Sequence, residues 1–141
     1  MPTLFEPIKI GSLELKNRLV RSATWDGAAD SEGMVTDAAV ALFRELGRGG
    51  IGLIITGHAF VSRLGQGSPG QYGIHRDEMI PGLCRLTDAV HREGAKIAVQ
   101  ITHCGINSGY LRRQGITLQG VSLLSEIETP HKEMTDAEIE A

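Results

Sequence analysis

The chain has little cysteine and no long apolar run, and these two features exclude several classes of protein. Its 141 residues contain two cysteines, Cys84 and Cys104, and they do not form a CxxC pair. This pattern argues against a disulfide framework and against a structural zinc site. No apolar run approaches the roughly 20 residues that cross a bilayer, and the first residues lack the basic start and apolar stretch of a secretory signal. We therefore expect a cytoplasmic protein with no membrane partner.

The chain also lacks blocks of basic residues and low-complexity tracts. Lys and Arg number 14 while Asp and Glu number 17, which gives a net charge of −3. Proteins that bind nucleic acid usually present a basic face, so we expect no nucleic-acid partner. An apolar share of 41% over 141 residues is typical of one soluble globular domain.

Hydrophobic patterns and turn signals predict strands and helices that alternate along the chain. The predicted order is a hairpin over 8–15, a buried strand over 19–24, a helix capped by Thr36 and ended by the glycines at 47–50, a strand over 52–56, a helix from Pro81 to Gly94, and a strand over 96–101. This order predicts an α/β fold with parallel pairing.

Two features concern the rest of the chain. Residues 59–80 and 104–134 read as long loops after strands, and long loops in such places often build sites. Thr135 and Glu138 form a capping-box pattern that opens a helix. Because the chain stops at Ala141, about one turn later, we expect the N-terminal piece of a longer protein.

The run from Lys96 to Gly105 is the most informative segment, because its apolar residues give way to hydrogen-bonding side chains. The carboxyl ends of buried parallel strands open into sites in this manner. The Gln100 amide both donates and accepts, which suits the edge of a heterocycle. Ser22–Trp25 places small residues before an aromatic one. Either a flat cofactor approaches there and Trp25 shapes the pocket, or the segment is tightly packed with Trp25 in the core.

Three other patterns suggest chemistry with less support. Gly65–Gly70 matches GxGxxG, but it lies well beyond the strand, contains Pro69 and does not lead into an apolar helix, so a flexible loop is favoured over a dinucleotide-binding fingerprint. The histidines and cysteines have no recognised metal-ligand spacing, so no metal site is predicted. His103 and Cys104 are either a catalytic pair or a hydrogen-bonded histidine beside a buried thiol.

Four segments together resemble the old yellow enzyme family of NADH:flavin oxidoreductases, and they occur in the family's order across nearly the whole chain. They are residues 4–11, 16–24, 52–57 and 100–105. The resemblance implies the N-terminal part of a flavin-binding (β/α)₈ TIM barrel, with about three βα units behind an N-terminal hairpin. It also implies an FMN cofactor that takes hydride from NAD(P)H and passes it to a small-molecule substrate, an activated α,β-unsaturated alkene.

The resemblance further implies which residues bind the flavin. By position these are Ser22, Ala23, Thr24, Trp25, His58 and Gln100. Gln100 falls on the glutamine that contacts the flavin pyrimidine, and His58 falls where the family usually has a small residue. Ala23 replaces a frequent proline, Trp25 replaces a threonine or cysteine that tunes the flavin, and Ile106 replaces an arginine. These departures bear on substrate preference and redox tuning.

The family's substrate-holding residues and its phosphate-binding elements would lie beyond Ala141, so no catalytic residue is assigned here. We expect residues 1–141 to be a partial flavin-binding domain that is inactive alone. Its open sheet would leave residues such as Leu53, Ile55, Ile97 and Val99 without an opposite wall, which favours a homo-oligomer or disordered loops. The alternatives are a Rossmann-like nucleotide-binding module and a non-catalytic truncated product that pairs with another chain.

Overall fold

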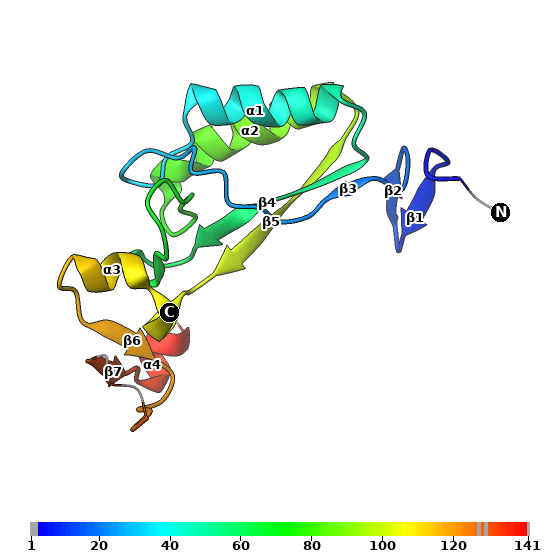
Figure 1. Ribbon diagram of the computed structural model, residues 1–141. Helices are drawn as coiled ribbons and strands as arrows, with labels where there is room; N and C mark the ends of the chain where they lie inside the picture. Colours follow the sequence, from blue (N-terminus) through cyan, green and yellow to red (C-terminus); the bar gives the residue numbers. More distant parts are fainter. Residues whose placement is uncertain (1–2, 127, 129, 141) are drawn as a thin grey trace.

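The computed structural model describes residues 3–126, 128 and 130–140. Its strands and helices (Figure 1) are Ile8–Ile10 (β1), Leu13–Leu15 (β2), Val20–Arg21 (β3), Asp37–Arg48 (α1), Leu53–Phe60 (β4), Ile80–Arg92 (α2), Lys96–Thr102 (β5), Gly109–Arg113 (α3), Leu118–Gly120 (β6), His131–Glu133 (β7) and Asp136–Glu140 (α4). Short 3-10 turns lie at Arg63–Gly65, Asp77–Met79 and Gly105–Asn107.

The N-terminal hairpin forms as its sequence predicts. Strands β1 and β2 pair antiparallel, with Ile8 opposite Leu15. Gly11 in the turn has a φ of 58°, a left-handed conformation that glycine adopts without a steric cost.

The central sheet is parallel, with the strand order β3-β4-β5. β4 runs to Phe60, four residues beyond the predicted end at Thr56, and β5 matches its predicted span to within one residue. The first strand differs more, because pairing covers only Val20 and Arg21 and the Val20 side chain is 47% exposed. The prediction of a buried strand over 19–24 is therefore wrong. From Ser22 onward the chain leaves the ladder, and Thr24 and Trp25 lie against Gly57 of β4.

Helices α1 and α2 lie side by side on one face of the sheet (Figure 1). Thr36 caps α1 as predicted: its Oγ1 accepts from the Ala39 N–H at 3.2 Å and donates to the Ala28 carbonyl at 2.6 Å. Pro81 lies in the first turn of α2, where its missing N–H leaves no bond unmade. The core between helices and sheet includes Ala39, Phe43, Ile54, Tyr72, Leu86 and Val90.

The strand register decides which side chains face these helices. Ile54 lies opposite Ile97, and both pack in the helix-covered core. Leu53 and Ile55 flank Ile54 along β4 and therefore face the other side. The prediction that Ile97 and Val99 share the inward face of Leu53 and Ile55 is wrong, because Ile54 is the partner of Ile97 and Val99 lies two residues further along β5 on the same side as Ile97.

The two long segments after β4 and β5 are more ordered than the sequence predicted. The first returns to the sheet, where Phe60 N donates to Tyr72 O at 2.9 Å. The second builds α3 and the parallel pair β6–β7 near the carboxyl ends of β4 and β5 (Figure 1). The predicted capping box is confirmed at the start of α4, where Thr135 N donates to Glu138 and Glu138 N donates to Thr135 Oγ1. The Lys132 ammonium and the Thr135 N–H lower the pKa of Glu138 to about 2.

Among the described residues, the helices are all too short or too polar to cross a membrane.

Candidate functional site at the strand ends

The Ser22–Trp25 segment lies directly against β4 at Gly57. A Cβ added at Gly57 would come within 2.8 Å of the Thr24 carbonyl oxygen and 3.3 Å of Trp25 Cα. Only a residue without a side chain allows the two backbones to approach so closely. The sequence signal for this contact is the glycine that directly follows the predicted strand over 52–56.

The residue after Gly57 lies beside Gln100. A bulge in β4 between Ile55 and His58 sets His58 opposite Gln100 on β5. The bulge is held by Thr56, whose Oγ1 accepts from the Gln100 N–H at 3.3 Å. The Gln100 side chain is exposed, and no described residue makes a hydrogen bond with its carboxamide. Register and alternation place the Gln100 side chain on the face of the sheet that is turned away from α1 and α2. We call this face the open face.

Trp25 does not occupy the core. Its side chain is 50% exposed, so the interpretation of Trp25 as a core anchor is wrong. The ring packs beside Gly27, where an added Cβ would lie 3.2 Å from Trp25 Cζ2. Ser22 and Thr24 are exposed as well, and Thr24 Oγ1 donates to the Ser22 carbonyl at 3.1 Å. The segment therefore offers small polar groups and an exposed aromatic surface.

Arg21 lies beneath this segment, on the helix side of the sheet. Its Nη1 donates to the Ile55 carbonyl at 3.1 Å, and its Nη2 donates to the Thr24 carbonyl at 3.3 Å. The guanidinium also lies over the Phe43 ring, 5.3 Å from the centroid. Sequence reasoning missed Arg21, although an arginine within a predicted buried strand was the available signal.

A second pair of buried polar side chains meets Arg21. Tyr72 donates from its hydroxyl to Asp26 Oδ1 at 2.8 Å, and Asp26 Oδ2 lies 3.9 Å from Arg21 Nη2. Burial, and then the Asp26 carboxylate, raise the pKa of Tyr72, so the hydroxyl keeps its proton. Neither Asp26 nor Tyr72 stands out in the sequence, because 46 residues separate them.

The GxGxxG segment does not form a dinucleotide-binding turn. It follows a 3-10 turn and leads into no α-helix. Its glycines are required by packing, because a Cβ at Gly65 would overlap the His103 ring and one at Gly67 would overlap the Cys104 sulfur. Buried Gln71 holds the loop by accepting from Gly67 N at 2.7 Å. The Rossmann-like alternative is therefore wrong, and the segment is a loop, the favoured interpretation, with contacts to Gln71, His103 and Cys104.

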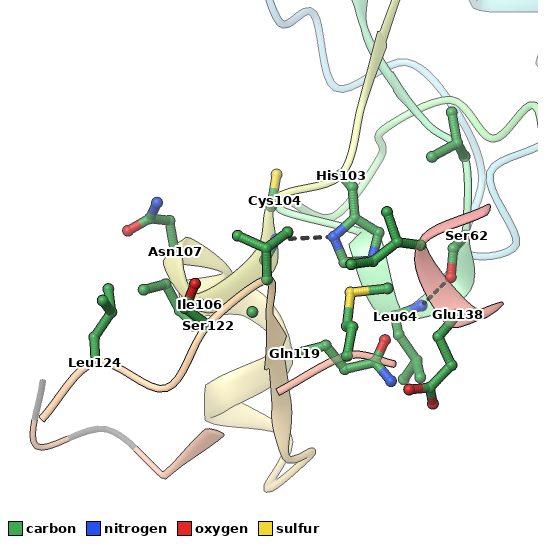
Figure 2. Close-up of a pocket in the computed structure, with 16 residues that line it drawn as sticks. Ser62, Leu64, His103, Cys104, Ile106, Asn107, Gln119, Ser122, Leu124 and Glu138 are labelled. Atoms are coloured by element: carbon green, nitrogen blue, oxygen red, sulfur yellow. Dashed lines mark hydrogen bonds between the residues drawn. The ribbon is translucent and has the colours of Figure 1, made fainter. Parts of the chain in front are cut away.

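His103 and Cys104 are packed and not set up for nucleophilic catalysis. His103 Nδ1 accepts from the Gly105 N–H at 3.2 Å, and Figure 2 shows the His103 ring and the Cys104 thiol pointing apart. Burial raises the pKa of Cys104 and lowers that of His103. A protonated thiol beside a neutral imidazole is not an activated nucleophile. This favours the structural interpretation of the pair.

A cavity of about 680 Å³ opens beside these two residues (Figure 2). It lies between the segments that follow β4 and β5 on one side and β6 with α4 on the other. Its lining is mainly apolar, with contributions from Leu64, Ile106, Leu124 and Ile139. In the described part of the chain, His, Cys, Asp and Glu side chains form no group of three that could hold a metal ion. The cavity has room for an apolar group but offers no activated nucleophile.

Comparison with known proteins gives consistent matches. The sequence profile of the NADH:flavin oxidoreductase / NADH oxidase family matches residues 3–141. A 4,4'-dithiodibutanoate disulfide reductase from Rhodococcus erythropolis is 38% identical over 130 residues, which are 88% of this chain and 30% of that protein. NADPH dehydrogenase from Listeria monocytogenes is 35% identical over 106 residues, 74% of this chain and 31% of that protein.

Solved structures agree with these matches. A 2-naphthoyl-CoA reductase in complex with 2-naphthoyl-CoA superposes with a TM-score of 0.88 at 34% sequence identity. The match covers 97% of this chain and 23% of the reductase chain. The old yellow enzyme of a Pichia species superposes with a TM-score of 0.84 at 26% sequence identity, and the match covers 97% of this chain and 39% of that enzyme. The chain thus spans about a quarter to two fifths of these relatives.

Proposed function

The chain belongs to the NADH:flavin oxidoreductase / NADH oxidase family, and from this premise we propose that the protein carrying it is an FMN-dependent oxidoreductase in which residues 1–141 form part of the flavin-binding domain. The family match confirms the resemblance found in the four sequence segments. The superposition on old yellow enzymes confirms an α/β fold that corresponds to the N-terminal part of a (β/α)₈ barrel. FMN is the cofactor of the family and NADH or NADPH its reductant, as the sequence predicted.

The residues at the strand ends fit the ring system of a flavin. The observation that carries the proposal is the meeting of three segments on the open face: Thr24 and Trp25 against Gly57, and His58 opposite Gln100. The exposed Gln100 carboxamide can donate to a ring carbonyl and accept from a ring N–H, which is the pattern of the flavin pyrimidine edge. The missing side chain at Gly57 lets the Thr24–Trp25 backbone lie close to β4.

The other candidate residues would complete the walls of the ring site. Ser22, Ala23 and Thr24 offer backbone groups and small side chains along one side of the ring. Trp25 offers an exposed aromatic surface at the end of that segment, and His58 adds a polar side chain from β4. When bound, FMN supplies two-electron chemistry, taking hydride from NAD(P)H and giving it to an acceptor. The chain's own part is to bind and orient the ring.

We propose a small activated alkene, conjugated to a carbonyl, as the acceptor. The names of the relatives widen the choice, since one reduces a disulfide and another is a reductase of an aromatic acyl-CoA. Groups that polarise the acceptor and bind the flavin phosphate would come from residues outside this chain, which spans less than half of each of these relatives. A non-catalytic product that pairs with another chain is the remaining alternative.

The test uses the purified protein that contains this chain. Its visible spectrum should show bound FMN, and NADH or NADPH oxidation should depend on an added α,β-unsaturated ketone. A disulfide such as 4,4'-dithiodibutanoate is the comparison acceptor. Turnover with the disulfide alone would overturn the alkene assignment and leave the flavin assignment standing. Purified protein that neither carries FMN nor takes it up would overturn the proposed function as a whole.

A further inference from the structure

A chain of three polar side chains, all buried or largely buried, runs under the Ser22–Trp25 segment, on the side away from the open face. It begins with the hydrogen bond from the Tyr72 hydroxyl to Asp26 Oδ1. It ends with the ion pair between Asp26 Oδ2 and Arg21 Nη2, which lie 3.9 Å apart without a hydrogen bond. Asp26 also accepts from the Ala28 N–H at 3.1 Å through the oxygen that Tyr72 contacts. We call these three residues the Tyr72–Asp26–Arg21 relay.

Arg21 fixes the distance between two pieces of backbone. Its planar guanidinium donates to the carbonyl of Ile55, just before the bulge in β4, and to the carbonyl of Thr24. Arginine suits this task because its donors leave one rigid plane in set directions, whereas an ammonium group has no such fork. The place of Thr24 against β4 is therefore set by the orientation of one side chain.

The orientation of Arg21 is in turn held from the far end of the relay. The Tyr72 backbone is bound to the end of β4 through the Phe60 N–H at 2.9 Å. Its ring packs edge-on against Phe43, with centroids 6.3 Å apart, and the residue is 3% exposed. A side chain so confined presents its hydroxyl to Asp26 in one place only.

We infer that Tyr72 is a positioning residue of the flavin-ring site: through Asp26 and Arg21 it sets where the Ser22–Trp25 segment lies, and thereby how the ring is held. The inference rests on the proposed function and adds a residue that does not reach the open face. Supporting contacts of this kind keep a site in its productive geometry. Sequence position gives no hint of it, because Tyr72 lies in a loop that follows β4.

The test compares Tyr72→Phe with two controls in the protein that contains this chain. The variant keeps the ring in the core and removes only the hydroxyl. Tyr110→Phe removes a hydroxyl from α3, and Val90→Ala weakens the same core but removes no polar group of the relay. Three readouts are taken: the dissociation constant of FMN, the visible absorption maxima of the bound flavin, and its reduction potential, the last two at saturating FMN.

Tyr72→Phe should weaken FMN binding about tenfold, equivalent to about 1.4 kcal/mol, because the Ser22–Trp25 segment is no longer held in the geometry that fits the ring. It should also shift the absorption maxima and the reduction potential, whereas both controls should retain the wild-type values. Asp26→Asn, which keeps an oxygen for Tyr72 but removes the charge facing Arg21, should shift them in the same direction. If Tyr72→Phe does not fold, the Asp26→Asn variant tests the inference in its place.

If Tyr72→Phe keeps the wild-type spectrum, reduction potential and FMN affinity, the inference is overturned and the proposed function still stands. The same holds if Val90→Ala shifts these quantities as much as Tyr72→Phe does. If the wild-type protein itself binds no FMN, the proposed function is overturned and the inference with it. The two failures are therefore distinguished by the wild-type measurement.

Discussion

His58 lies opposite Gln100 in the pairing of β4 with β5, and the bulge in β4 puts it there. The chain advances three residues from Ile55 to His58 while β5 advances two from Ala98 to Gln100. In regular pairing Gly57 would lie opposite Gln100, and His58 would point to the other face of the sheet. The His58 side chain therefore lies on the open face because of the bulge in β4.

Gln100→Ala should weaken FMN binding by about 10-fold to 100-fold, because a buried ring group would lose its partner at a cost of roughly 1–3 kcal/mol. The melting temperature of the flavin-free protein should stay near that of wild type, since the exposed side chain fills no core space. Flavin titration and thermal unfolding measure the two quantities. Gln114→Ala, an exposed glutamine after α3, is the matched control. Unchanged affinity in Gln100→Ala would remove Gln100 from the ring site.

Gly57→Ala should displace the Thr24–Trp25 backbone, because the new Cβ would meet the Thr24 carbonyl oxygen at 2.8 Å and backbone atoms cannot swing aside. We expect the free energy of unfolding to fall by about 1–3 kcal/mol and FMN affinity to fall with it. Urea unfolding and flavin titration test this. In Gly109→Ala the added Cβ meets only the flexible Arg113 side chain, at 3.5 Å, and stability should hold. Equal behaviour of the two variants would contradict the close approach at Gly57.

The sequence predicted the elements whose signals are local. The hairpin about Gly11, the Thr36 cap and the Thr135–Glu138 capping box depend on residues within a few positions of one another, and all three are present. The α/β class followed because alternating strands and helices leave few arrangements. Gln100 was recognisable because a polar side chain ended an apolar strand.

The features that the sequence did not reveal depend on distant partners. The relay joins Asp26 to Tyr72 across 46 residues, and neither residue has a local pattern that predicts it. Trp25 was ambiguous because a large aromatic residue suits a core and a pocket wall equally well. Gly65 and Gly67 matched a phosphate-binding motif although their actual constraint is contact with His103 and Cys104, far along the chain.

Thr36→Ala should lower the free energy of unfolding by about 1–2 kcal/mol, because it removes the cap of α1 and the hydrogen bond to the Ala28 carbonyl. Thr36→Ser keeps the hydroxyl and should retain most of the stability. Urea unfolding of both variants beside wild type measures the difference. Equal losses in the two variants would show that the methyl group, not the hydroxyl, supports this end of the helix.

Stability should fall on mild acidification, partly through His103. Burial lowers the pKa of His103 below its ordinary value of 6.5, so the unfolded chain binds a proton at a pH where the folded protein does not. The free energy of unfolding should therefore decrease from about pH 7 to about pH 5. Burial lowers the pKa of His75 too. His103→Gln and His75→Gln should each flatten the dependence, measured as the slope of unfolding free energy against pH. A His103→Gln slope identical to that of wild type would contradict the assignment.

The exposed edge of the sheet gives the last prediction. In the described part of the chain β5 pairs only with β4, and Val99 and Ile101 on it are 44% and 63% exposed. An unpaired strand edge with exposed apolar side chains beside it invites pairing with another chain. A polypeptide of residues 1–141 expressed alone should therefore self-associate, or exchange its β5 amides rapidly with solvent. Ile101→Lys should reduce the association, since a charged side chain on an edge strand opposes pairing with a strand of another chain. Analytical ultracentrifugation with hydrogen exchange measures both. A monomer with strongly protected amides in β3, β4 and β5 would show that this segment completes its own core. The interpretation of residues 1–141 as an open part of a barrel would then be wrong.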